Sequence, residues 1–130
     1  MFKRIDYITI QTDDVAGAAQ VWESTLGLKG RAPQAMVGVR SISVPVGDAY
    51  LELAQPEGEG PYGDWLRQQG EGMCLVGIDV DDLAAAIAHL RARGAKVSEP
   101  HEGGVPGVSF ALVDTASTHG VPIALVQRST

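Results

Sequence analysis

The first part of the chain alternates hydrophobic and polar residues and then changes to a helical spacing. Residues 5–12 are rich in β-branched side chains, which predicts a strand. Asp13 and Asp14 follow, and either carboxylate can accept hydrogen bonds from the first N–H groups of a helix. The expected helix ends near Gly27 and carries its hydrophobic residues on one core-facing stripe. That stripe contains Val15, Ala18, Ala19, Trp22 and Leu26.

The same pattern occurs again in the second half of the chain. Residues 73–80 predict a strand, and a second helix should begin at Asp81 and Asp82. Asp81 lies 68 residues after Asp13, and the flanking positions keep this offset. The sequence therefore predicts a tandem repeat of one structural unit. The hydrophobic stripe of the second helix contains Leu83, Ala86, Ile87 and Leu90.

Shorter elements follow the first helix. Residues 35–44 predict a strand, residues 45–48 a turn, and residues 49–54 a return strand whose only charged residue is Glu52. Tyr62–Gln69 could form a short helix that connects the two halves.

The second half continues in a similar way. A short strand is expected at Val97–Ser98 and a Gly/Pro-rich loop at residues 101–107. Residues 108–113 predict a strand, residues 114–120 a turn, and residues 121–127 the last strand.

Each half is interpreted as β-α-β-β-β, so the predicted fold class is α+β. Residues 1–69 would form one module and residues 70–130 the other, within a single domain. A ferredoxin-like β-α-β-β-α-β arrangement fits less well, because it leaves residues 110–127 unexplained.

Composition narrows the range of partners and compartments. The chain has 130 residues and a net charge of −6, and its ten Lys and Arg residues do not cluster on one element, which disfavours nucleic acid or an anionic membrane as partner. No apolar run approaches the ~20 residues needed to cross a bilayer. The chain has one cysteine, Cys74, and no apolar signal region at its start. A reducing, cytoplasmic location is therefore expected.

Three further features are shared with one protein family. Ile5–Ile8 looks like the N-terminal sequence pattern of this family, in which a histidine occupies the position of Tyr7. Gly60–Leu66, followed by Gly70–Met73, resembles the linker of methylmalonyl-CoA epimerases, and Ser117–Val126 resembles their closing turn and strand. With the paired modules, these stretches resemble the vicinal oxygen chelate superfamily of glyoxalase I, bleomycin-resistance proteins and extradiol dioxygenases.

The resemblance implies that the two modules form a curved, mixed sheet shaped as a half-barrel. It also implies a divalent metal on the concave face of this sheet, at positions that correspond to Tyr7, Glu52, Leu75 and Ala124. Only Glu52 is a good ligand. Tyr7 would have to bind as a phenolate, although a phenol has an ordinary pKa of ~10, and Leu75 and Ala124 have no donor side chain. A first-row metal generally needs several ligands from His, Cys, Asp or Glu. The metal site is therefore expected to be lost, and no cofactor is expected.

The side chains that should line the concave face follow from the two-residue period of the strands. Neighbouring inward positions would be apolar to weakly polar: Ile5, Thr9, Tyr50, Ala54, Met73, Gly77, Pro122 and Val126. The expected ligand-binding set is Tyr7, Thr9, Tyr50, Glu52, Met73, Leu75 and Ala124.

Glu52 is the main candidate for chemistry. Partial desolvation inside a cavity would make its carboxylate a better general base or an acceptor for a ligand. The alternative is a relic carboxylate that is hydrogen-bonded to Tyr7. Tyr7 and Tyr50 could stack on a planar ligand and orient it, or they could simply fill the core.

The remaining polar residues are given structural roles. His89 is expected at the surface, His101 in a loop and His119 in a turn, none of them as a metal ligand. Cys74 should point toward the helices and behave as a small buried hydrophobic residue. The aspartate pairs are expected to cap helices.

Three functions remain open at this point. The first is metal-free binding of a small organic molecule in a curved, mostly apolar cavity. The second is an epimerase-like isomerase or lyase that acts next to a carbonyl, with Glu52 as base and Tyr7 or backbone N–H groups stabilising the enolate. The third is a non-catalytic association domain. A homodimer is expected in each case.

Overall fold

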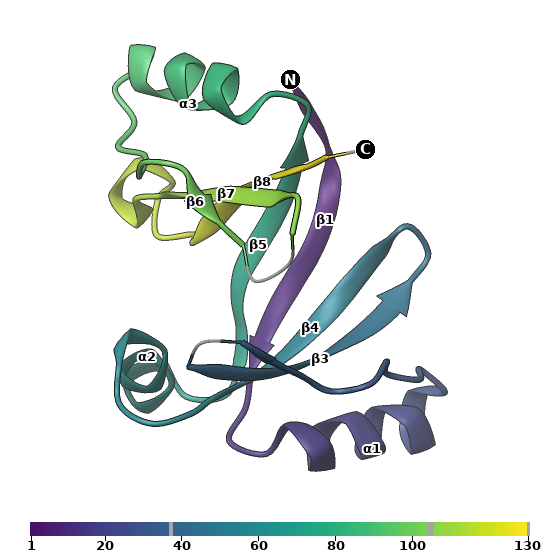
Figure 1. Ribbon diagram of the computed structural model, residues 1–130. Helices are drawn as coiled ribbons and strands as arrows, with labels where there is room; N and C mark the ends of the chain where they lie inside the picture. The colour runs from purple at the N-terminus through teal and green to yellow at the C-terminus, as the bar shows by residue number, and fades with distance from the viewer. Residues whose placement is uncertain (37, 104–105, 130) are drawn as a thin grey trace. The chain divides into compact units, whose positions relative to one another are not determined.

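The computed structural model describes residues 1–36, 38–103 and 106–129, apart from the side chains of Met36 and Pro61. Its elements confirm the predicted α+β fold with a mixed sheet. They are, in order, β1 (Phe2–Gln11), α1 (Val15–Leu26), β2 (Gln34–Met36), β3 (Val39–Val46), β4 (Ala49–Pro56), α2 (Pro61–Gln69), β5 (Gly72–Val80), α3 (Leu83–Ala92), β6 (His101–Glu102), β7 (Val108–Val113), the 3-10 helix η1 (Thr115–Ser117) and β8 (Ile123–Arg128) (Figure 1).

The chain forms two compact units. Residues Tyr7–Cys74 make up one, called here the N-terminal unit. Residues Met1–Asp6 and Leu75–Thr130 make up the other, the C-terminal unit. The long first strand β1 therefore contributes its beginning to one unit and its end to the other.

The N-terminal unit has the strand order β2-β3-β4-β1. β1 runs parallel to β4, and the two other neighbouring pairs are antiparallel. Helix α1 covers one face of β3 and β4 (Figure 1). Burial of apolar side chains between helix and sheet stabilises this unit. The cluster contains Val15, Ile42, Val44 and Leu53, with Ile10, Ala18, Ala19, Trp22, Leu28 and Leu51 packed against it.

The C-terminal unit repeats this arrangement with the strand order β1-β5-β8-β7-β6. β5 runs parallel to β8, and β7 lies antiparallel to both β8 and β6. Helix α3 packs on β7 and β8. Three of the four predicted stripe residues of this helix belong to the buried core, and Leu90 packs against it. This core contains Val80, Leu83, Ala86, Ile87, Val97, Ala111, Val113 and Leu125, with Leu90, Ala95 and Ile123 packed against it.

The repeat extends to the helix caps. The Asp14 carboxylate accepts from the Gly17 N–H at 3.0 Å, and the Asp82 carboxylate accepts from the Ala85 N–H at 3.1 Å, which confirms the predicted caps. A second pair of caps was not predicted, because it joins residues far apart in sequence. The Val15 N–H donates to Gln55 Oε1 at 2.9 Å, and the Leu83 N–H donates to Gln127 Oε1 at 2.7 Å.

The prediction of one strand over residues 35–44 is wrong. This stretch contains two antiparallel strands, β2 and β3, and Gly38 lies between them with φ = 77°. A glycine adopts this left-handed conformation without steric cost, so the chain can reverse there. Val37, which the same prediction includes, lies outside the described residues.

The second module also differs from the prediction. The short strand is β6, at His101–Glu102, within the stretch expected to be a loop, whereas Val97 makes only an isolated bridge to Val113. His101 and Glu102 are both exposed and show no alternation of hydrophobic and polar residues. Only the pairing with β7, for example of His101 with Phe110, identifies them as a strand. Gly104 and Val105 of the expected loop lie outside the described residues.

The end of α1 corrects one core assignment. Leu26 was expected on the buried stripe, but it is 61% exposed. Gly27 has φ = 73° and ends the helix, and the Leu28 N–H turns back to the Trp22 carbonyl at 3.4 Å. Leu28 therefore takes the place in the core that the helical spacing assigned to Leu26.

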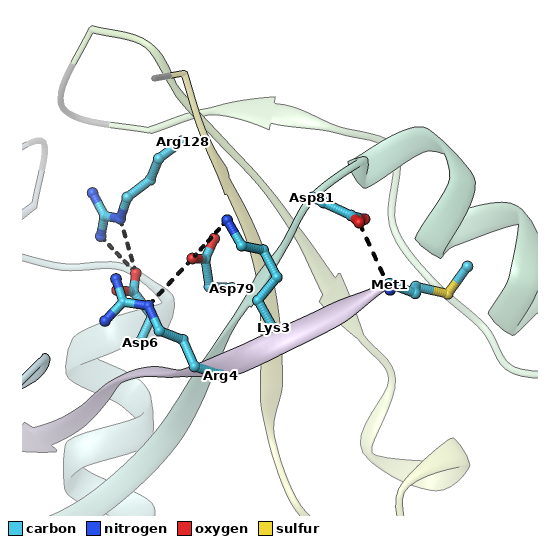
Figure 2. A network of polar contacts seen from close by, with 7 residues as sticks. All are labelled: Met1, Lys3, Arg4, Asp6, Asp79, Asp81 and Arg128. Atoms are coloured by element: carbon cyan, nitrogen blue, oxygen red, sulfur yellow. Dashed lines mark hydrogen bonds and ion pairs between the residues drawn. The ribbon is translucent and has the colours of Figure 1, made fainter.

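A network of ion pairs joins the strands of the C-terminal unit (Figure 2). The buried Asp6 carboxylate accepts from Arg128 Nε at 3.0 Å and from Arg128 Nη2 at 2.7 Å. Arg4 reaches both Asp6 and the buried Asp79 at 3.4 Å, and Lys3 Nζ lies 4.0 Å from Asp79. Carboxylates buried to this extent need such partners, because a lone buried charge is strongly unfavourable.

Candidate functional site

One face of the N-terminal sheet carries most of the chemistry predicted from the sequence. Successive side chains of a strand point to opposite faces, and α1 packs on the face that contains Ile42, Val44 and Leu53. The other face is polar. Cross-strand pairing arranges its side chains in three rows across β1, β4 and β3: Tyr7, Tyr50 and Pro45; Thr9, Glu52 and Ser43; and Gln11, Ala54 and Ser41.

The middle row places a carboxylate between two hydroxyl groups. Thr9 and Glu52 are direct neighbours on parallel strands, and the Thr9 hydroxyl donates to Glu52 Oε1 at 3.1 Å. Thr9 is buried and Glu52 is half-buried. Ser43 stands opposite Glu52 on the other side, across the antiparallel β3/β4 ladder. The carboxylate is thus held in a fixed orientation by its own sheet.

The first row presents two aromatic rings. Tyr7 pairs with Tyr50 in the register, and their rings stack with centroids 5.2 Å apart and an interplanar angle of 24°. Such a separation is typical of a favourable aromatic pair. Both residues are half-buried, so the rings form part of a rigid, partly accessible surface beside Glu52.

The third row is tied to the linker between the two halves. The Gln11 side-chain amide donates to the Gly70 carbonyl at 3.0 Å. Next to it, the Glu71 carboxylate accepts from the Thr12 hydroxyl at 2.6 Å and from the Asp13 N–H at 3.2 Å. These hydrogen bonds, first that from Thr12, lower the pKa of Glu71 below its ordinary value.

Cys74 lies within reach of the charge on Glu52. Burial, and after it the negative charge of Glu52, raise the pKa of the Cys74 thiol to about 11, whereas a backbone hydrogen bond from Gln11 opposes the shift. The predicted burial of Cys74 is confirmed. Cys74 belongs to neither of the two core clusters beneath the helices. A thiol with this pKa is almost entirely protonated near neutral pH and is therefore unreactive.

A pocket of about 330 Å³ lies at the start of α1, on a different part of the N-terminal unit. Its acidic residues already have structural contacts, since Asp14 caps α1 and Glu71 accepts from Thr12 and Asp13. The pocket also includes Gly17, Ala18, Val21 and Trp22.

The expected ligand-binding set is divided between the two units. Tyr7, Thr9, Tyr50 and Glu52 come together on the polar face of the N-terminal unit. Met73 belongs to the same unit and is 78% exposed. The other two members, Leu75 and Ala124, belong to the C-terminal unit. Leu75 is half-buried, and Ala124 lies buried in β8, where it pairs with Gly77 of β5. Neither Leu75 nor Ala124 contributes a polar side chain.

Three polar residues of this face were not predicted as site residues. Gln11, Ser41 and Ser43 make the face more polar than the apolar to weakly polar surface expected from the sequence. A signal was present, because Ser41 and Ser43 alternate with the core residues Ile42 and Val44. Without the register between β3 and β4, however, the sequence could not place these serines beside Glu52.

The three histidines lie elsewhere. His89 is half-buried rather than fully solvated: its ring makes an edge contact with Phe2 at 6.4 Å, and its Nδ1 lies 3.1 Å from Arg93 Nη1. The exposed His101 packs on Phe110 with ring centroids 5.5 Å apart. His119 is exposed in a turn with φ = 56°.

The donor set for a metal is poor. Within residues 1–36, 38–103 and 106–129, no group of three or more His, Cys, Asp or Glu side chains is arranged to hold a metal ion. Of the four positions at which the family resemblance implies ligands, Leu75 and Ala124 carry no donor atom, and Tyr7 is stacked on Tyr50. These residues do not fit a site that generally requires several imidazole, thiolate or carboxylate ligands.

Comparison with known proteins identifies related sequences and folds. A family model described as the Glyoxalase/Bleomycin resistance protein/Dioxygenase superfamily matches residues 6–112. A comparison with curated protein sequences finds no significant match. Where the structure describes the chain, every helix is too short or too polar to cross a lipid bilayer.

Solved structures confirm the resemblance inferred from the sequence. A variant of Streptomyces coelicolor methylmalonyl-CoA epimerase in complex with 2-nitronate-propionyl-CoA is 27% identical, with a TM-score of 0.90, covering 100% of this chain and 97% of that chain. The Mycobacterium tuberculosis methylmalonyl-CoA epimerase is 21% identical, with a TM-score of 0.90 and coverage of 99% and 90%. A hypothetical protein from Bacillus halodurans is 22% identical, with a TM-score of 0.91 and coverage of 98% and 95%. The latter two show similarity of fold.

Proposed function

Because this chain belongs to the Glyoxalase/Bleomycin resistance protein/Dioxygenase superfamily, we propose that it binds a small organic molecule on the polar face of its N-terminal unit, without a divalent metal. The observation that carries this proposal is the combination of a stacked Tyr7–Tyr50 pair with a Glu52 carboxylate held by Thr9. Aromatic walls with a few fixed polar groups are typical of small-molecule sites.

The rigidity of this face supports a binding role. Each polar group lies on a strand whose neighbours are set by backbone pairing, and Thr9 and Glu52 are also joined by their side chains. Such a surface loses little conformational entropy when a ligand binds, which favours affinity. The related epimerase from Streptomyces coelicolor, which is bound to an acyl-CoA analogue, is consistent with a role for this fold in holding small molecules.

A ligand screen by thermal shift tests this proposal, because a molecule that binds the native state raises the unfolding midpoint. We expect hits for the wild-type protein, and we expect Glu52→Gln to weaken them. Glu59→Gln is the matched control, since Glu59 is an exposed carboxylate in the same unit and the substitution removes the same charge. Hits that respond equally to both substitutions would place the binding site elsewhere.

The metal-free part of the proposal has its own test. Metal analysis of the purified protein should find no stoichiometric zinc, cobalt, nickel or manganese. A stoichiometric ion that is lost in Glu52→Gln and retained in Glu59→Gln would contradict it.

A second candidate is an enzyme that removes a proton next to a carbonyl group. The fixed orientation of the Glu52 carboxylate and the 27% identity to a methylmalonyl-CoA epimerase favour it. Glu52 would accept the α-proton, and the resulting enolate oxygen would need a donor such as the Tyr7 hydroxyl or a backbone N–H. Ala124, at the position that corresponds to a second acid/base residue in the family, argues against ordinary epimerisation.

Solvent exchange separates the enzyme from the binding protein. With an acyl-CoA substrate in deuterated buffer, an enzyme of this kind incorporates deuterium at the α-carbon, and Glu52→Gln should abolish the exchange. Exchange that continues in Glu52→Gln would exclude Glu52 as the base.

A further inference from the structure

The polar face of the N-terminal unit carries a single formal charge. The strand segments that form its rows are residues 7–11, 39–46 and 49–56, and they contain one acid, Glu52, and one arginine, Arg40. Arg40 pairs in the register with Gln55 on the side of α1. Arg40 Nε also lies 3.4 Å from Glu57. A ligand on this face therefore meets a carboxylate and two phenols, and the nine residues of the three rows include no Lys or Arg.

Several other cations of the chain are engaged by carboxylates of their own. Arg67 pairs with Asp64, and Arg91 pairs with Glu99 at 3.0 Å. In the C-terminal unit, the basic side chains of Figure 2 lie against Asp6 and Asp79. With a net charge of −6, the chain has few cations left to balance an acidic ligand.

The hydrogen-bonding capacity of the face points in the same direction. An ionised carboxylate only accepts hydrogen bonds, and its two oxygens offer roughly four acceptor positions. Thr9 donates to one of the two Glu52 oxygens, and a carboxylate accepts several hydrogen bonds at once. The negative charge of Glu52 also reaches Cys74, where it is the second cause, after burial, of the raised thiol pKa. Such surroundings favour cations and penalise carboxylates.

Resting on the proposed function, we infer that the ligand presents a flat, positively charged nitrogen group, such as an amidinium, to Glu52. Its plane would lie against the Tyr7–Tyr50 pair, since aromatic faces attract cations. A charge-assisted hydrogen bond to the carboxylate would fix its orientation. A ligand carboxylate would be repelled by Glu52 and would have to give up its hydration without a counter-charge.

Three probes of nearly equal shape test this inference. Benzamidine is a planar cation, benzamide is its neutral counterpart and benzoate is its anionic counterpart. Each is titrated into the full chain labelled with 15N, and backbone amide shifts of Tyr7, Thr9, Tyr50 and Glu52 are followed by NMR. We expect benzamidine to bind at least about tenfold more tightly than benzoate, with benzamide between them, because hydrogen bonds to a charged partner are the stronger class.

Two variants assign the preference to Glu52. Glu52→Gln keeps an acceptor for the Thr9 hydroxyl, and it should reduce benzamidine affinity about tenfold while leaving benzamide nearly unchanged. Glu59→Gln removes the same net charge from an exposed position and should leave the order of the three probes intact. A shared unfolding midpoint would show that both variants are folded.

The possible failures can be told apart. If benzoate shifts the same four amides at equal or lower concentration than benzamidine, the inference that the ligand is a cation is wrong. The proposal that the polar face binds small molecules would still stand. If benzamidine binds equally well to Glu52→Gln and to the wild type, Glu52 is not its partner and the inference is again wrong. If no probe shifts these amides at millimolar concentration, the proposed binding face is wrong, and the inference is wrong with it.

Discussion

The pairing of Thr9 with Glu52 is the residue-scale feature on which the site depends. Glu52 is half-buried, so its carboxylate has lost part of its hydration, and the Thr9 hydroxyl replaces part of what water supplied. The sequence identifies Glu52 as the only charge of its strand. The sequence does not identify Thr9 as the hydrogen-bond partner of Glu52, because 43 residues separate the two and only the parallel register brings them together.

Replacing Thr9 tests this pairing. Thr9→Val keeps the shape and removes the donor, so we expect a loss of about 1–2 kcal/mol in the free energy of unfolding, the usual cost when a partly buried polar group loses a hydrogen bond. Thr9→Ser retains the hydroxyl and should lose less. Urea unfolding of both variants measures the difference, and an equal loss for the two would assign the effect to packing instead of the hydrogen bond.

Cys74 gives a second residue-scale prediction, on pH. Its pKa is raised to about 11 by burial and then by Glu52, so the native thiol stays protonated where an unfolded thiol, with a value of 9.0, has ionised. The contribution of Cys74 to stability is therefore fully present below pH 9 and is lost as the pH rises toward 11. Thiolate absorbance should show this titration. Glu52→Gln should lower its midpoint only partly, because burial is the larger cause, and an unchanged midpoint would mean that Glu52 does not act on the thiol.

At the scale of elements, the two halves share a cap that the hydrophobic pattern does not reveal. Gln55 at the end of β4 and Gln127 at the end of β8 each accept the first N–H of a helix. The glutamines lie 40 and 44 residues after the helix starts that they cap. The parallel pairing of β1 with β4 and of β5 with β8 brings each strand end to its helix start.

Gln55→Ala and Gln127→Ala should each lower the free energy of unfolding by about 1 kcal/mol, the usual cost of a lost N-terminal cap. Gln20→Ala is the control, because Gln20 is exposed on α1 and alanine favours helix formation. Thermal and urea unfolding measure all three. If either cap variant is as stable as the control, water replaces that glutamine at the helix start.

The buried aspartates of the C-terminal unit belong to this scale as well, since Asp6 links β1 to β8 through Arg128. Arg128→Met should cost about 3 kcal/mol, the low end for breaking a buried ion pair, because the arginine side chain is 36% exposed. Adding Asp6→Asn removes the buried charge that Arg128 no longer balances, although Arg4 still lies 3.4 Å from it. The double variant should therefore be more stable than Arg128→Met alone, and a double-mutant cycle with additive losses would contradict this coupling.

At the scale of the whole molecule, we predict a homodimer, the commonest symmetric assembly of soluble proteins. Light scattering coupled to gel filtration should give twice the mass of one chain across a tenfold range of concentration. A single-chain mass at every concentration would contradict the prediction. The third function considered from the sequence, association without a ligand, would gain support from a stable dimer in which no ligand screen gives a hit.

The sequence by itself determined the repeat, the two helices with their aspartate caps, the α+β class and the family. These features depend on local spacing, and an offset of 68 residues makes the second copy visible. It also revealed the lack of metal ligands at Leu75 and Ala124, since residue type alone decides whether a donor atom exists.

Only the tertiary structure decided which polar groups meet. The two-residue turn at Gly47 and Asp48 sets the register between β3 and β4 that brings Ser43 opposite Glu52. The parallel pairing of β1 with β4 stacks Tyr7 on Tyr50 and gives Glu52 its donor. Strand pairing depends on contacts between distant residues, and the two-residue period specifies the face of a side chain without specifying its neighbour.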